Sequence, residues 1–162
     1  MKKLCVVLVL LVLVGCKQAT PTEFSTVALA DKVITFQEDE ITISAMLEKY
    51  KGKTIFIDVW ASWCKDCLQA LPKVKKLQQD FKDVPFVFIS IDKSIASWKS
   101  GIKKYNVTGE HYFLTSDRDG DFGSFIDLDW IPRYMIIDEK GKIIMFKSVQ
   151  ANDKRILEAL RN

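Results

Sequence analysis

Two cysteines separated by two residues, in Cys64-Lys65-Asp66-Cys67, are the part of this sequence best suited to chemistry. The pair directly follows an apolar run typical of a buried strand, and the pattern after it is helical, so Cys64 lies at the expected start of a helix. Backbone N–H groups and the helix dipole stabilise an anion there, which favours a thiolate on Cys64. We therefore expect Cys64 to attack a disulfide and Cys67, one turn further along, to resolve the mixed disulfide.

Three charged residues near the cysteines are expected to tune this reaction. Lys65 favours the Cys64 thiolate and Asp66 opposes it, so the sign of their combined effect on the redox potential stays open. Asp58 stands in an otherwise apolar strand, where a desolvated carboxyl with a raised pKa would suit it to take the proton from Cys67. The alternative for Asp58 is a partly exposed carboxyl at the end of the strand.

Alternating strand and helix patterns are expected to hold the cysteine pair in place. The predicted strands are 33–36, 41–43, 54–60, 84–91, 111–114, 134–137 and 142–146. The predicted helices are 45–50 after a Ser44 cap, 64–81, 94–105, 122–126 and a last one that ends at residue 160. The order strand, helix, strand, helix in the middle of the chain implies a right-handed parallel unit. Residues 31–162 are thus predicted to form one α/β domain.

The N-terminus has the pattern of a segment that is removed. Two lysines precede an apolar run at 4–14, which is too short to span a bilayer as a helix of about 20 residues. The following Leu13-Val14-Gly15-Cys16 resembles the bacterial lipobox, whose cysteine is acylated. This resemblance implies a signal peptide at 1–15, a lipidated tether at 16–30, and a body held by lipid on the periplasmic or cell-surface side of a bacterial membrane. An ordinary secretory signal or an uncleaved anchor stays open.

Metal binding and nucleic-acid binding are disfavoured by the composition. A zinc or iron–sulfur site normally needs about four ligands, whereas, with Cys16 acylated, the body offers only Cys64, Cys67 and His111. The acidic segment 117–121 lacks the spacing of a calcium-binding loop and is predicted to be a surface turn. The 24 basic and 21 acidic residues are dispersed, with a net charge of +3. We therefore expect no metal, no cofactor besides the redox-active disulfide, and no nucleic-acid partner.

Beyond these local patterns, the sequence resembles the thioredoxin superfamily and, within it, the membrane-anchored TlpA/ResA-like thiol-disulfide oxidoreductases. The resemblance rests on residues 56–67, which read Phe-Ile-Asp-Val-Trp-Ala-Ser-Trp-Cys-Lys-Asp-Cys, on Pro72, and on Trp130-Ile131-Pro132-Arg133-Tyr134. It implies an α/β thioredoxin-like fold, in which helices flank a central mixed sheet. It also implies a TlpA-type central insertion between Cys67 and Pro132.

The resemblance further assigns a substrate-binding edge. Pro132 matches the family's cis-proline, which leaves the backbone of Ile131 free to pair with an extended substrate. Trp63 is expected at the exposed rim of the site, and Trp130 either adds to that rim or packs inside. Arg133 stands where a threonine is common, and is expected to bias the groove toward acidic partners.

The reaction implied by the resemblance is the reduction of protein disulfides by a monomer, which a membrane electron donor of the DsbD/CcdA type re-reduces. The lysine that thioredoxins place beside the strand aspartate is replaced here by Phe88, which leaves Asp58 less compensated. A thiol peroxidase is disfavoured, because the residues around Cys64 do not match that class. A disulfide oxidant or isomerase with the same residues stays open, as does a non-enzymatic binding module or metallochaperone.

Overall fold

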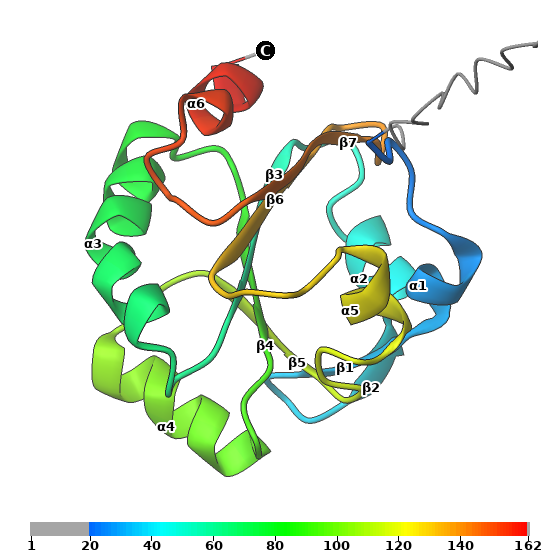
Figure 1. Ribbon diagram of the computed structural model, residues 1–162, viewed down its shortest axis with the longest axis vertical. Helices are drawn as coiled ribbons and strands as arrows, with labels where there is room; N and C mark the ends of the chain where they lie inside the picture. The colour runs from blue at the N-terminus through cyan, green and yellow to red at the C-terminus, as the bar shows by residue number, and fades with distance from the viewer. Residues whose placement is uncertain (1–19, 162) are drawn as a thin grey trace, which may run out of the picture.

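The computed structural model describes residues 20–161, so the predicted signal peptide and Cys16 lie outside the described residues. One sheet runs through the described part (Figure 1), with the strand order β2-β1-β5-β4-β3-β6-β7. Its strands are β1 (Lys32–Thr35), β2 (Glu40–Thr42), β3 (Ile55–Trp60), β4 (Phe86–Ser90), β5 (Glu110–Leu114), β6 (Arg133–Ile137) and β7 (Ile143–Ser148). The helices are α1 (Thr26–Ala30), α2 (Ile43–Glu48), α3 (Lys65–Asp80), α4 (Ile95–Tyr105), α5 (Asp121–Phe125) and α6 (Lys154–Arg161).

The middle of the sheet is the predicted parallel unit. β3 pairs in parallel with β4, and β4 with β5, whereas β6 runs antiparallel to β3 and β1 antiparallel to β5. Figure 1 shows α3, α4 and α6 on one side of the sheet and α1, α2 and α5 on the other. Because β3 and β4 point the same way, the loops that follow them leave the sheet at the same edge. One of these loops leads into α3 and carries Cys64.

Burial of the central strands explains their continuous apolar sequences. Every residue of β3 and of β4 is buried, as expected for strands that helices cover on both faces. Along one face of β3, Phe56 packs on Phe86 and Trp60 on Phe88, with ring centroids 4.8 and 6.4 Å apart. Such aromatic pairs add packing energy beyond the area they bury, so they stabilise β3 against β4, the strand next to it in the sheet.

Helix α3 begins at the cysteine pair and continues through Pro72 to Asp80. Its buried positions, Cys67, Leu71, Val74 and Leu77, follow the spacing of one helical face. The helix therefore packs this buried face against the core, and its first turn lies at the edge of the sheet. The predicted helix at 64–81 is confirmed to within one residue at each end.

The tether predicted at 16–30 is wrong in its second half. Residues Thr26–Ala30 form α1, in which Ala28 is fully buried. The ring of Phe24 packs 5.4 Å from that of Phe125 on α5, so the folded domain begins before residue 31. A helix this short shows no apolar periodicity in the sequence, and its stability depends on the Ser25 N-cap and on its tertiary contacts.

The start of helix α2 also differs from the prediction. Thr42, not Ser44, is the N-cap, and its hydroxyl accepts the N–H of Ala45 at 3.0 Å. Thr42 ends strand β2 in an extended conformation, which is the backbone geometry that an N-cap requires. The strand therefore leads directly into the helix, and Ser44 lies within the first turn.

Candidate active site

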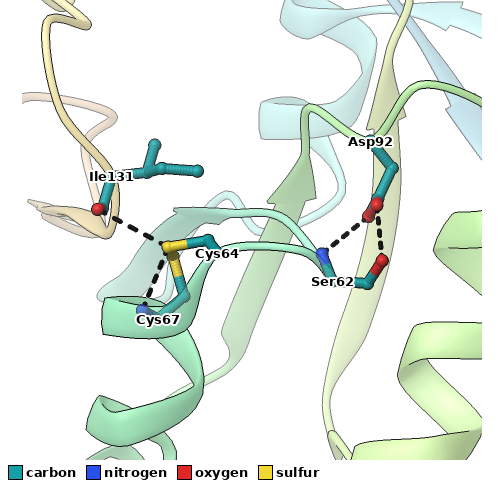
Figure 2. The surroundings of a disulfide bond; sticks show 5 residues. All are labelled: Ser62, Cys64, Cys67, Asp92 and Ile131. Carbon is teal, nitrogen blue, oxygen red and sulfur yellow. Dashed lines mark hydrogen bonds between the residues drawn. A yellow bond between two sulfur atoms is a disulfide. The ribbon is translucent and has the colours of Figure 1, made fainter.

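Cys64 and Cys67 form a disulfide across the first turn of α3, with their Cα atoms 5.3 Å apart (Figure 2). Cys64 is the N-cap of the helix, and its Sγ accepts the N–H of Cys67 at 3.0 Å. The same Sγ lies 3.6 Å from the carbonyl oxygen of Ile131. In the reduced protein, the N–H donor and the helix N-terminus stabilise a thiolate on Cys64, which gives it the character of a nucleophile.

A groove of about 270 Å³ opens beside Cys64. Trp63 and Trp130 line it and are 53% and 58% exposed, whereas Trp60 is buried in the core. The other lining residues are Lys65, Asp66, Arg118, Asp129 and Ile131. Exposed aromatic side chains next to a reactive group are typical of a binding surface, so the groove is where a partner can reach Cys64. Trp130 thus belongs to the rim together with Trp63.

The segment before β6 closes one side of the site. The peptide bond between Ile131 and Pro132 is cis, as the family resemblance implies. The carbonyl of Ile131 faces Cys64, and the side chain of Ile131 lines the groove. An extended substrate bound to Cys64 would therefore run beside the backbone of Ile131.

Arg133 does not face the groove, and its predicted effect on partner choice is wrong. Its side chain is 1% exposed and donates to the carbonyl oxygens of Ile126 and Asp127, at 2.5 and 2.6 Å. It also forms an ion pair with Asp129. The two carbonyls lie just past the end of α5, where a cation is favourable. Arg133 therefore stabilises the segment that connects α5 to β6. The exposed arginine of the groove is Arg118.

Replacing Arg133 with leucine is expected to lower the free energy of unfolding by about 2–4 kcal/mol, because buried carbonyls lose their donor. Urea unfolding, followed by fluorescence, measures this change. Arg118→Leu is the matched control, since it removes an exposed guanidinium and should change stability by less than about 0.5 kcal/mol. Equal stability of the two variants would show that Arg133 does not support the segment.

Asp58 is the buried carboxyl that the sequence predicts. It is 3% exposed in the middle of β3, and desolvation raises the pKa of its side chain to about 8. Its neighbours in register are Phe88 on β4 and Tyr134 on β6, so a phenyl ring stands where thioredoxins place a lysine. Among residues 20–161, no group donates a hydrogen bond to Oδ1 of Asp58. A carboxyl in this state can exchange a proton close to neutral pH.

Sequence reasoning missed Asp92, which holds the loop that carries Cys64. Its side chain accepts hydrogen bonds from the backbone N–H and the hydroxyl of Ser62, at 3.0 and 2.6 Å (Figure 2). The available signal was an aspartate just past a buried parallel strand, at the edge where sites of open α/β sheets form. That signal does not name Ser62 as the partner.

The remaining candidates have structural roles in the described part of the chain. The ring of His111 stacks on Phe88, and burial lowers the pKa of its imidazole. The segment 117–121 forms a turn that leads into α5. Within residues 20–161, no three His, Cys, Asp or Glu side chains are grouped so that they could hold a metal ion. In the same range, no helix is long and apolar enough to cross a membrane.

Two curated relatives are similar to this chain over much of the domain. ResA of Bacillus thuringiensis subsp. konkukian, a thiol-disulfide oxidoreductase, is 24% identical over 117 residues, which cover 71% of this chain and 66% of ResA. The thioredoxin-like protein YneN of Bacillus subtilis is 32% identical over 101 residues, or 60% of this chain and 57% of YneN. The chain thus spans slightly less than two thirds of the length of ResA, and less of YneN.

Solved structures share the fold. A solution structure of a candidate thiol-disulfide oxidoreductase from Bacteroides vulgatus has a TM-score of 0.68 and 29% identity, and the match covers 83% of this chain and 86% of that one. A thiol-disulfide oxidoreductase from Bacteroides fragilis has a TM-score of 0.66 and 20% identity, over 78% and 94% of the two chains. They confirm the thioredoxin-like mixed sheet flanked by helices. The Redoxin family model matches residues 24–160, and the chain therefore belongs to the Redoxin family, as a TlpA/ResA-like member of the thioredoxin superfamily.

Proposed function

We propose that this chain is an extracytoplasmic thiol-disulfide oxidoreductase that reduces protein disulfides with Cys64 and Cys67. The observation that carries the proposal is the position of the Cys64 sulfur, which caps a helix, accepts an N–H bond and borders an aromatic groove. The similarity to ResA, a thiol-disulfide oxidoreductase, supports thiol-disulfide exchange as the chemistry. Asp58, a buried carboxyl in the strand that leads to the pair, completes the set of groups that dithiol chemistry needs.

The proposed reaction has two steps. The Cys64 thiolate attacks one sulfur of the substrate disulfide, forms a mixed disulfide, and releases the other substrate sulfur as a thiolate that takes a proton from water. Cys67 then gives its proton to Asp58 and attacks the sulfur of Cys64, which releases the second substrate thiolate. Two electrons pass to the substrate, and the protein is left with the disulfide seen in the structure.

The groove supplies the proposed substrate site. An extended segment on either side of the substrate cysteine pairs with the backbone of Ile131, next to Pro132, while Trp63 and Trp130 cover its apolar side chains. Lys65 and Asp66 flank the reactive sulfur and adjust the stability of its thiolate. We propose that the protein acts as a monomer.

The proposed location follows from the sequence before the domain. The lipobox-like segment that ends at Cys16 supports a signal peptide at 1–15 and a lipid anchor at Cys16, on the periplasmic or cell-surface side of a membrane. A reductase in that compartment needs electrons from across the membrane, so we propose a donor of the DsbD/CcdA type. The tether is then shorter than the sequence suggested, because Phe24 already packs in the domain.

The redox potential tests the proposed direction. We expect a reversible two-electron couple below about −200 mV when the full chain equilibrates with glutathione or dithiothreitol buffers. Tryptophan fluorescence, with Trp63 beside the sulfur, reports the oxidised fraction. A potential near −120 mV, roughly that of DsbA, would instead indicate a disulfide oxidant. A protein with no reversible couple would be a binding module or metallochaperone, and the proposed enzyme function would be wrong.

A further inference from the structure

Asp92 lies beside the reactive loop although the proposed mechanism gives it no role. β3 and β4 are parallel neighbours, with Trp60 opposite Ser90 in register. The N–H of Ile91 donates to the carbonyl of Trp60 at 2.9 Å, so the two chains stay together past the last pair. Asp92 follows immediately and is 6% exposed. A buried carboxyl group needs hydrogen-bond donors, and the donors to Asp92 indicate its role.

The hydrogen bonds of Asp92 connect the end of β4 to the loop before α3 (Figure 2). The hydroxyl of Ser90 donates to Oδ2 at 2.8 Å and accepts the N–H of Asp92 at 3.0 Å, which fixes the side chain on its own strand. The two oxygens then accept the N–H and the hydroxyl of Ser62 at 3.0 and 2.6 Å. Both donors of Ser62 thus bind one carboxyl group, a geometry that sets the position and the rotation of this residue.

Helix α4 also lies close to Ser62. A Cβ atom on Gly101 would lie 2.3 Å from the Cβ of Ser62 and 3.2 Å from its hydroxyl oxygen. Real atoms do not approach so closely, so glycine at this position lets the helix touch the loop. Ser62 is therefore hydrogen-bonded to Asp92 and packed closely against α4.

Cys64 is only two residues beyond Ser62. The N–H of Cys64 donates to the carbonyl of Ala61 at 3.1 Å, so the loop forms a tight turn around Ser62. The contact that stabilises a thiolate on Cys64, with the N–H of Cys67, depends on where this turn ends, and so does the position of the sulfur beside the carbonyl of Ile131. Because such contacts weaken steeply with distance, a displacement of about 1 Å is enough to reduce reactivity strongly.

We infer that Asp92 is a positioning residue, which acts through Ser62 to keep the Cys64 sulfur at the N-terminus of α3. This inference rests on the proposed function, in which Cys64 is the nucleophile. We call the two hydrogen bonds from Ser62 to Asp92 the clamp. When the clamp is broken, the turn samples other positions and the thiolate loses contact with its N–H donor. Cys64 then becomes less reactive even though the fold persists.

The test compares Asp92→Asn and Ser62→Ala with the wild type in the reduced full chain. The rate of Cys64 alkylation by iodoacetamide is followed by mass spectrometry across pH. We expect D92N to be alkylated about three- to tenfold more slowly at pH 7, with the midpoint of the pH profile moved upward. S62A should change in the same direction and by less, because it keeps the N–H bond and the carboxyl of Asp92.

The two variants also distinguish a change in the position of Cys64 from a change in the charge near it. Loss of a negative charge near Cys64 would by itself favour the thiolate and speed alkylation, so faster alkylation of D92N would overturn the inference. The other charged residues around Cys64, namely Lys65, Asp66, Arg118 and Asp129, are unchanged in both variants. S62A, which changes no charge, decides the question if D92N does not fold.

Asp31→Asn is the matched control, because Asp31 makes a similar clamp on another loop. Its side chain accepts the N–H of Lys32, the hydroxyl of Ser116 and the N–H of Phe122, at 2.8, 2.7 and 2.9 Å. D31N should lose stability and keep the wild-type alkylation profile. If D92N and S62A behave like D31N, Asp92 only stabilises the fold. If the wild type shows no disulfide exchange, the proposed function fails, whereas alkylation still tests the clamp.

Discussion

Replacing Cys67 with serine is expected to leave the protein covalently joined to its substrate. The Cys64 thiolate still attacks, but a serine hydroxyl cannot displace the substrate sulfur, so the mixed disulfide accumulates. We expect turnover of a peptide with an internal disulfide to fall by at least about 10³-fold, since resolution is lost. Non-reducing electrophoresis and mass spectrometry of the C67S protein, incubated with that peptide, measure the adduct.

The reciprocal variant distinguishes the two cysteines. Cys64→Ser should form no adduct, because Cys67 is 3% exposed and lies outside the residues that line the groove. The double variant C64S/C67S controls for non-covalent binding. Equal trapping by C64S and C67S would mean that the nucleophile has been misassigned, and the proposed order of the two steps would have to be abandoned.

Asp58→Asn is expected to slow resolution of the mixed disulfide by about 10²-fold at pH 8, the usual contribution of a general base. Only the ionised carboxylate accepts a proton, and the pKa of Asp58 is raised to about 8, so the wild-type rate should rise with pH and level off above that value. D58N should lack this inflection. Stopped-flow release of substrate from a preformed mixed disulfide, between pH 6 and 10, measures both effects.

The exposed carboxyl of Asp66 provides the control for that experiment. Asp66→Asn makes the same chemical change at the groove and should keep the inflection near pH 8, with a change in the redox potential instead. A D58N protein whose rate follows the wild-type pH profile would show that another group receives the proton from Cys67.

The pH dependence of protein stability gives an independent measure of the raised pKa of Asp58. The pKa of Asp58 is raised from 3.8 to about 8 on folding, so the folded state binds more protons than the unfolded state between these values. The stability that Asp58 contributes is therefore fully present below about pH 4 and decreases as the pH rises toward 8. D58N lacks this loss, and its stability relative to the wild type should increase over the same range in urea unfolding.

Local patterns predicted most of the fold. Each predicted strand has a counterpart whose ends differ by at most two residues, because long apolar runs and turn residues are short-range signals. The errors have two causes. Helix α1 packs against the rest of the domain through Phe24 and Ala28, and these tertiary contacts have no periodic signature in the sequence. The start of α2 is set by a local choice between two hydroxyl residues, in which Thr42 is the cap because its backbone is extended.

By itself, the sequence determined the reactive pair and its place between a buried strand and a helix, because these depend on neighbouring residues, and it favoured a buried Asp58. Only the tertiary structure decided which distant groups surround the pair. It turned Arg133 inward to the end of α5, brought Trp130 to the rim beside Trp63, and placed Asp92 on Ser62. Each of these contacts requires the strand order and the packing of helices on both faces, which no short stretch of sequence specifies.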